Sequence, residues 1–143
     1  MTRNPMPLQN KIQIIELPIT DQFLSQKRLI QERGELALIE DGQQFQHLGY
    51  FSLLAGKGYR GGHYHNHKVE NFYIISGQLL VDLVDVETNE KDQIELQSGT
   101  KAIIYPGLAH RFHAIQDSQV IEYYNDVYNS YDDIIFDFDK YFV

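Results

Sequence analysis

The sequence contains no cysteine and has few positive charges, and each shortage excludes some functions. Without cysteine the chain has no disulfide, no catalytic thiolate and no cysteine-ligated zinc, so a bound metal must use His, Asp or Glu. The formal net charge is −8, which would repel a nucleic-acid backbone or an anionic membrane surface. We therefore expect no nucleic-acid partner.

Long apolar runs are missing as well. No stretch approaches the roughly 18 residues that are needed to span a membrane. The N-terminal residues also lack the apolar run of a secretory signal. Because the lack of cysteine fits a reducing compartment, these absences together predict a soluble cytoplasmic protein without a membrane partner.

What the sequence does contain is apolar and aromatic surface for one core. Hydrophobic residues make up 43% of the chain, and 143 residues is a typical length for one domain, so residues 1–143 are expected to form a single domain. Gly and Pro stand singly between short runs rich in β-branched and aromatic residues, a pattern typical of strands and turns. Their short connections favour an antiparallel sandwich or barrel over βαβ units. The predicted strands are residues 11–17, 35–40, 47–54, 71–76, 78–86, 92–96, 100–105 and 118–127.

Two segments have a less regular pattern. Residues 21–32 carry apolar side chains such as Phe23 and Ile30 at a spacing that predicts one helix in the first half of the chain. Residues 131–143 alternate acids with aromatics, which is compatible with a strand, a short helix or a subunit contact.

The most informative stretch contains two histidines and an acid. His63 and His65 are two residues apart, so on a strand their imidazoles point to the same face. Glu70 begins the next apolar run, and a tight turn after His65 would bring its carboxylate beside the two rings. The three side chains would then offer two nitrogen ligands and one oxygen ligand to a metal ion.

A fourth candidate ligand lies far along the chain. His110 follows the turn sequence Tyr105-Pro106-Gly107, which would deliver the histidine to the start of another strand. Three imidazoles and one carboxylate suit a divalent metal ion such as Zn, Ni, Fe, Mn or Co and leave open positions for water or substrate. The residue types alone do not select among these metals.

The spacing of these residues resembles the two sequence motifs of the cupin superfamily. The first motif corresponds to residues 63–77, and the second to residues 99–110. The resemblance implies an all-β double-stranded β-helix, a jelly-roll barrel with at most one or two short helices. The metal ligands that it implies are His63, His65, Glu70 and His110. The chain departs from the motifs at three turn positions, with Tyr105 for proline, Ala114 for asparagine and Lys57 for glycine.

Other stretches resemble particular cupin enzymes. Residues 33–40, 60–65 and 131–138 are similar to the dTDP-sugar 3,4-ketoisomerases, and residues 106–112 are similar to the dTDP-4-keto-6-deoxysugar 3,5-epimerases. Both resemblances imply an isomerase or epimerase in surface polysaccharide biosynthesis. Its substrate would be a small molecule, a nucleotide-linked 4-keto-6-deoxysugar, and its chemistry would be proton transfer next to the carbonyl.

Glu70 leaves two versions of that chemistry open. The ketoisomerases resemble cupins that have lost the metal, use two histidines as acid and base and usually have Gln at this position. In the metal-free version, His63 and His65 would move the proton themselves. In the metal-assisted version, which Glu70 permits, a divalent ion would act as a Lewis acid.

Three further side chains are candidates for the site. Tyr105 would be a general acid near His110 or would pack over its turn. Arg60 would bind a phosphate of the substrate or form an ordinary ion pair. Phe72 alternates with Glu70 and would line the interior, as core or as a substrate contact, whereas Tyr73 would face outward.

The remaining histidines are weaker candidates for metal ligation. His67 shares the strand face of His63 and is a minor alternative to Glu70. His113 lies three residues after His110, which predicts a surface position. His47 has no predicted role.

Two other functions remain open. One is a non-catalytic metal-binding or sugar-binding cupin with an accessory or regulatory role, and the less favoured one is an iron dioxygenase with the three-histidine and glutamate ligand set. Similarity to small cupins also implies a homodimer, with the N-terminal segment crossing to the partner.

Overall fold

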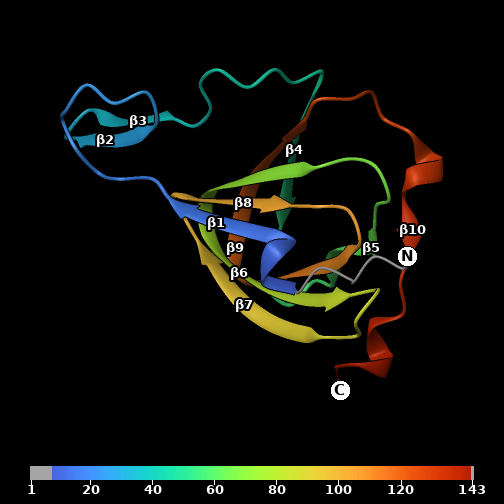
Figure 1. The fold of residues 1–143 in the computed structure, drawn as a ribbon. Helices are drawn as coiled ribbons and strands as arrows, with labels where there is room; N and C mark the ends of the chain where they lie inside the picture. Colours follow the sequence, from blue (N-terminus) through green and yellow to red (C-terminus); the bar gives the residue numbers. More distant parts are fainter. Residues whose placement is uncertain (1–7, 143) are drawn as a thin grey trace.

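A computed structural model describes residues 8–142 as an almost entirely β fold (Figure 1). Its helical content is three single 3-10 turns, η1 (Leu8–Asn10), η2 (Ser130–Asp132) and η3 (Phe138–Lys140). None of the helical turns in the described range is long and apolar enough to span a membrane. The strands are β1 (Ile12–Glu16), β2 (Lys27–Gln31), β3 (Gly34–Leu38), β4 (His47–Leu53), β5 (Tyr59–Tyr64), β6 (Glu70–Asp85), β7 (Lys91–Gln97), β8 (Thr100–Ile104), β9 (Leu108–Tyr124) and β10 (Ile134–Ile135).

Two long antiparallel strands, β6 and β9, connect the whole barrel. They pair with each other along almost their full length. The first part of β6 also pairs with β8 and the second part with β7. In the same way, the start of β9 pairs with β5 and its end with β4. The two strands therefore link the two halves of the barrel, as the jelly-roll prediction requires.

The bend in β6 lies at Gly77. The register with β9 shifts on both sides of this residue, and its φ angle is 93°. A Cβ atom at this position would lie 2.3 Å from Oγ of Ser118 and 2.4 Å from the carbonyl oxygen of Asp117, so only glycine fits. The predicted strands 71–76 and 78–86 are for this reason one bent strand.

The main core fills the barrel behind the site. It contains alternate residues of β6, including Leu79, Val81 and Leu83, which are fully buried against Leu108 and Phe112 of β9. The outward face of β6 is covered by the C-terminal segment, where Phe138 forms a second small cluster with Val84 and Ala109. The C-terminal tail, whose structure the sequence left open, therefore consists of η2, the short strand β10 and η3.

The helix predicted for residues 21–32 is wrong. Its second half is strand β2, which forms a two-stranded antiparallel hairpin with β3. Phe23 is fully exposed, so the apolar spacing that suggested a buried helix face does not correspond to a buried surface. Cross-strand pairing with residues 34–38 therefore decided the conformation over local propensity.

Tyr73 lies on the face of β6 opposite the core residues Phe72 and Ile74, as predicted, yet it is buried. The residue was expected to face outward, but only 2% of it is exposed. The β2–β3 hairpin covers this part of β6, so the charges of Arg28 and Glu35 lie close enough to the Tyr73 hydroxyl to affect its pKa. Strand alternation predicts which face of β6 a side chain lies on, but it does not predict that the hairpin covers that face.

Candidate metal centre and its cavity

The structure brings the four predicted ligands together inside the barrel. His63 comes from β5, Glu70 from the start of β6 and His110 from β9, while His65 lies in the connection after β5. One ligand atom from each residue lies within 4.8 Å of the other three. The ring centroid of His63 is 4.7 Å from that of His65 and 5.0 Å from that of His110.

A glycine in β5 permits this close approach. The register between β5 and β9 shifts between Gly61 and His63, and the φ angle of Gly61 is 84°. A Cβ atom at Gly61 would lie only 2.8 Å from the carbonyl oxygen of His110. The bulge lets the backbone of β5 come close to β9, so that His63 turns toward His110.

Backbone carbonyl groups determine which ring nitrogens of two histidines face the centre. Nδ1 of His65 lies 2.6 Å from the carbonyl oxygen of Asp132, and Nδ1 of His110 lies 3.0 Å from that of Leu108. A carbonyl oxygen only accepts hydrogen bonds, so each Nδ1 carries the hydrogen and donates it. In the neutral rings, Nε2 then presents a lone pair, as metal-ligating histidines do.

The three atoms at the centre form a buried group of acceptors. Oε1 of Glu70 lies 2.5 Å from Nε2 of His65 and 3.1 Å from Nε2 of His110. All three atoms are buried, and none has a hydrogen-bond partner. Acceptors at these distances repel one another unless a proton or a cation lies between them. The residues therefore fit a divalent metal ion that is held by three nitrogens and one oxygen.

The pKa shifts indicate that a proton and a metal cation would compete for the position between these side chains. Burial, together with the nearby His110 and His65, lowers the pKa of His63 to about 4, so its ring is neutral at pH 7. Burial by itself would lower the pKa of His65, but the Glu70 carboxylate outweighs it and raises that pKa. Burial likewise opposes ionisation of Glu70, yet His110 and His65 lower its pKa. A metal ion would displace any proton held between these groups.

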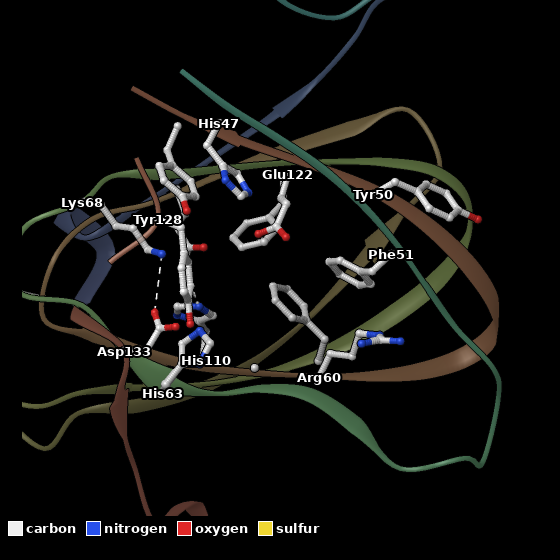
Figure 2. A pocket seen from close by; sticks show the side chains of 15 residues that line it. His47, Tyr50, Phe51, Arg60, His63, Lys68, His110, Glu122, Tyr128 and Asp133 are labelled. Carbon is white, nitrogen blue, oxygen red and sulfur yellow. Dashed lines mark hydrogen bonds and ion pairs between the residues drawn. The ribbon is translucent and has the colours of Figure 1, made fainter. Parts of the chain in front are cut away.

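The centre opens into a cavity of about 350 Å³. Figure 2 shows His63 and His110 on one side, with Glu122 of β9 and His47 of β4 on the other. Arg60, Phe51 and Tyr50 also line the cavity. Lys68 enters it from the loop before β6, where its Nζ lies 3.5 Å from Oδ1 of Asp133. The cavity therefore combines the centre with basic, acidic and aromatic side chains.

Glu122 is a site residue that the sequence reasoning missed. No side chain of residues 8–142 forms a hydrogen bond or ion pair with its carboxylate. Burial and the charge of Glu70 raise the pKa of Glu122, whereas His47 opposes the shift. Val120 and Tyr124, two positions before and after it, are both buried. Strand alternation therefore places this acid on an inward face once the burial of its neighbours is known.

The other predicted site residues lie in several places. Arg60 lines the cavity, where its Nε donates to the carbonyl oxygen of Ser52 at 2.9 Å, and no carboxylate within residues 8–142 forms an ion pair with it. Phe72 also lines the cavity and is 3% exposed, so it belongs to both the core and the site. Tyr105 is not among the described residues that line the cavity. Its backbone N–H donates to Lys11 in the turn before β9, a position that fits packing rather than acid catalysis.

Three histidines outside the centre also have defined positions. His67 is exposed and its backbone N–H donates to Asp132, so Glu70 rather than His67 belongs to the centre. Nε2 of His113 lies 2.8 Å from Asp82 on the outer face of the barrel, as its predicted surface position requires. His47 stacks on Tyr124 with a centroid distance of 4.2 Å and lines the cavity.

Comparison with solved structures shows which class of fold this is. The sugar 3,4-ketoisomerase QdtA from Thermoanaerobacterium thermosaccharolyticum superposes with a TM-score of 0.71 at 18% identity, covering 92% of this chain and 91% of that chain. The dTDP-4-dehydrorhamnose 3,5-epimerase from Sulfolobus tokodaii superposes with a TM-score of 0.69 at 21% identity, covering 89% of this chain and 77% of that chain. The TDP-quinovose 3,4-ketoisomerase WlaRB from Campylobacter jejuni superposes with a TM-score of 0.68 at 16% identity, covering 90% of this chain and 95% of that chain. The protein therefore has the jelly-roll fold of the cupins, as its two motifs predicted.

The family is shown by the sequence itself. The profile described as the polysaccharide biosynthesis C-terminal domain matches residues 30–134, which is more than half of the chain. The chain belongs to this family. No curated protein matches it significantly by sequence.

Proposed function

We propose that the protein is a metal-binding cupin that isomerises or epimerises a nucleotide-linked 4-keto-6-deoxysugar in polysaccharide biosynthesis. The observation that carries the proposal is the convergence of four ligand atoms at the wall of a cavity that also holds a carboxylate without a partner among residues 8–142. The substrate class is supported by the similar structures, because crystals of QdtA contain TDP or TDP-4-keto-6-deoxyglucose. The family profile supports the biosynthetic role.

The reaction needs a base beside the carbon next to the carbonyl and a stabiliser for the enolate oxygen. His63, His65, Glu70 and His110 would hold a divalent metal, and that metal would supply a Lewis acid for the carbonyl oxygen. Among residues 8–142, Arg60 forms a hydrogen bond only through Nε, to Ser52, so its Nη groups would bind a substrate phosphate.

We assign the proton transfer to Glu122 when the metal is present. The four ligands are then engaged, and Glu122 lines the same cavity without a partner of its own within residues 8–142. Its raised pKa brings the carboxyl closer to the range in which it accepts and returns a proton. In a metal-free enzyme His63 would be the base, because it lines the cavity and its lowered pKa keeps the ring neutral. His65 is 3% exposed, its Nδ1 donates to Asp132 and its Nε2 faces Glu70 inside the centre, so it suits ligation better than proton transfer.

The proposal is tested by hydrogen exchange into the substrate. The protein is stripped with chelator, divided, and reloaded separately with Zn, Ni, Fe, Mn or Co. Each sample is incubated with dTDP-4-keto-6-deoxyglucose in deuterated water. We expect deuterium at the ring carbon next to the carbonyl, measured by mass spectrometry and NMR, in at least one metal-loaded form.

The other two functions give different results in the same samples. Tight binding of the nucleotide sugar with no exchange in any form would contradict the enzyme and support an accessory binding protein. Oxygen consumption that depends on ferrous iron would support a dioxygenase. Exchange that is equal with and without metal would refute the metal-assisted version and leave the histidine version.

A further inference from the structure

The C-terminal segment directly contacts a proposed ligand of the metal centre. Asp132 ends the 3-10 turn η2, far from the motifs in sequence, and is 6% exposed. Its carbonyl oxygen lies 2.6 Å from Nδ1 of His65. The orientation of a proposed ligand therefore depends on a residue outside both cupin motifs.

The carboxylate of Asp132 holds the loop that follows this ligand. Oδ1 accepts hydrogen bonds from the backbone N–H groups of Asn66 at 2.8 Å and His67 at 3.2 Å. Oδ2 accepts from the backbone N–H of Lys68 at 3.2 Å. Three consecutive amides thus converge on one buried carboxylate, an arrangement that fixes the loop between His65 and Glu70.

The segment that carries Asp132 is itself anchored to the strand of another ligand. In β10, Ile135 pairs with His63 of β5, and the backbone N–H of Phe136 donates to Gly62 at 3.0 Å. Oδ1 of Asp133 lies 3.2 Å from Nδ1 of His65, so a charge also faces this ring. Residues 132–136 therefore contact or pair with two of the four proposed ligands, His65 and His63.

We propose that Asp132 is a positioning residue of the metal centre, and that docking of the C-terminal segment and metal binding stabilise each other. The inference rests on the metal site of the proposed function and does not depend on which reaction occurs there. The carboxylate holds the loop, the carbonyl oxygen fixes the ring and tautomer of His65, and Nε2 then points at the metal position. Since coupling between two sites is reciprocal, a bound metal also tightens the docked segment.

The test compares four full-length proteins: the natural chain, Asp132→Ala, Asp132→Asn and Asp137→Ala. Asp137 is the matched control, because its carboxylate caps the neighbouring turn η3 by accepting from Asp139 at 3.1 Å and forms no hydrogen bond with the loop of residues 66–68. Affinity for Zn²⁺ and Co²⁺ is measured by calorimetry after removal of bound metal. The visible absorption of the Co²⁺ form reports the coordination geometry, and circular dichroism reports folding.

We expect Asp132→Ala to lower metal affinity by about 10- to 100-fold, the usual effect of losing a residue that supports a ligand. The Co²⁺ spectrum should change as well, because without the carboxylate the loop of residues 66–68 is no longer held and the carbonyl oxygen of residue 132 is less firmly docked against His65. Asp132→Asn keeps one acceptor oxygen and should restore part of the affinity, while Asp137→Ala should match the natural chain. Natural affinity and an unchanged spectrum in Asp132→Ala would overturn the inference.

The outcome separates this inference from the proposed function. If the natural chain binds neither metal, the metal centre itself is refuted, and the inference falls with it. If the natural chain binds metal and all three variants bind equally well, only the inference fails.

A second measurement uses the intact chain, in case Asp132→Ala does not fold. Amide hydrogen exchange of Asn66, His67, Lys68 and residues 130–136 is followed with and without Zn²⁺. We expect zinc to slow exchange by about fivefold or more, which is the lower end of typical coupling between linked sites. Unchanged rates at all these amides would overturn the inference.

Discussion

Oε1 of Glu70 lies 2.5 Å from Nε2 of His65, and no hydrogen bond joins these two buried atoms. The carbonyl oxygen of Asp132 engages the other ring nitrogen of His65, so the neutral ring directs a lone pair at the carboxylate. Two acceptors held this closely need a proton or a cation between them. The relationship explains why glutamate at this position favours a metal centre.

Glu70→Gln is therefore expected to weaken metal binding while leaving the metal-free protein at least as stable as the natural chain. The amide lacks the charge of the carboxylate, so affinity for Zn²⁺ should fall by more than the roughly 10- to 100-fold that loss of a supporting residue causes. The amide NH₂ is able to donate to Nε2 of His65 or His110, so the metal-free variant should melt at or above the temperature of the metal-free natural chain. Calorimetry and thermal melts measure the two effects. A variant that binds zinc as tightly as the natural chain would contradict the assignment of Glu70.

Glu122→Gln tests the role of the cavity carboxyl. The amide keeps the shape of the side chain but does not accept the proton, so we expect deuterium exchange into the substrate to fall by about 10²- to 10⁴-fold. Metal affinity should be unchanged, because Glu122 is not one of the four ligands. The control is Glu90→Gln in the exposed turn before β7, which should have natural activity. Full exchange in Glu122→Gln would assign the proton transfer to another residue.

Glu40 should make stability depend on pH in the acid range. Oε1 of Glu40 lies 3.0 Å from Nζ of Lys101 and accepts from the hydroxyl of Tyr123 at 2.9 Å. Burial alone raises the pKa of Glu40, but these two partners outweigh it and lower the pKa. Because the folded pKa lies below the unfolded one, the ionised group stabilises the fold above the unfolded value of about 4.3. This stabilisation is lost as the pH falls from there through the folded pKa.

The variant that isolates this effect is Glu40→Gln. It leaves the buried ammonium of Lys101 without its charge partner, so we expect a loss of about 3 kcal/mol in the free energy of unfolding at pH 7. The difference from the natural chain should begin to shrink as the pH falls below the unfolded value of about 4.3, and should go on shrinking as the pH passes through the lowered folded pKa. Denaturant titrations at several pH values measure it, with Asp41→Asn as an exposed control. A constant difference across the acid range would show that ionisation of Glu40 is not the cause.

A dimer is the expected assembly of this chain. The hairpin β2–β3 lies at one side of the barrel and forms a sheet of its own (Figure 1), and a two-stranded hairpin alone is only marginally stable. Between it and strands β4 and β9 lies a mainly apolar groove of about 450 Å³, lined by Leu38, Phe45 and Leu48. Leu48 is 63% exposed in the single chain. A second copy that covers this groove would bury these side chains. The predicted crossing of the N-terminal segment falls on residues 1–7, outside the described residues.

Light scattering tests the dimer. We expect the natural chain to have twice its formula mass, and Leu48→Glu to shift it to the monomer by placing a charge in the apolar groove. Ile115→Glu is the control, because Ile115 is 43% exposed but does not line the groove. A monomeric natural chain would contradict the predicted dimer.

The sequence predicted most strands, because alternation and turn residues are local features. It was wrong about residues 21–32, where apolar spacing fitted a helix but pairing with β3 stabilised a strand. It also missed Glu122, since an isolated acid in a strand has no motif. Its signal was the burial of Val120 and Tyr124 on either side, and burial is a property of the folded chain.

The sequence by itself determined the all-β architecture and the four candidate ligands, because the spacing of side chains along a strand follows from the geometry of the strand. Only the tertiary structure decided that Asp132 supports His65, that Glu122 shares the cavity and that Tyr105 does not. These contacts join residues that are far apart in the chain. They depend on strand register, on the bend at Gly77 and on where the tail docks, and no local pattern of residues specifies them.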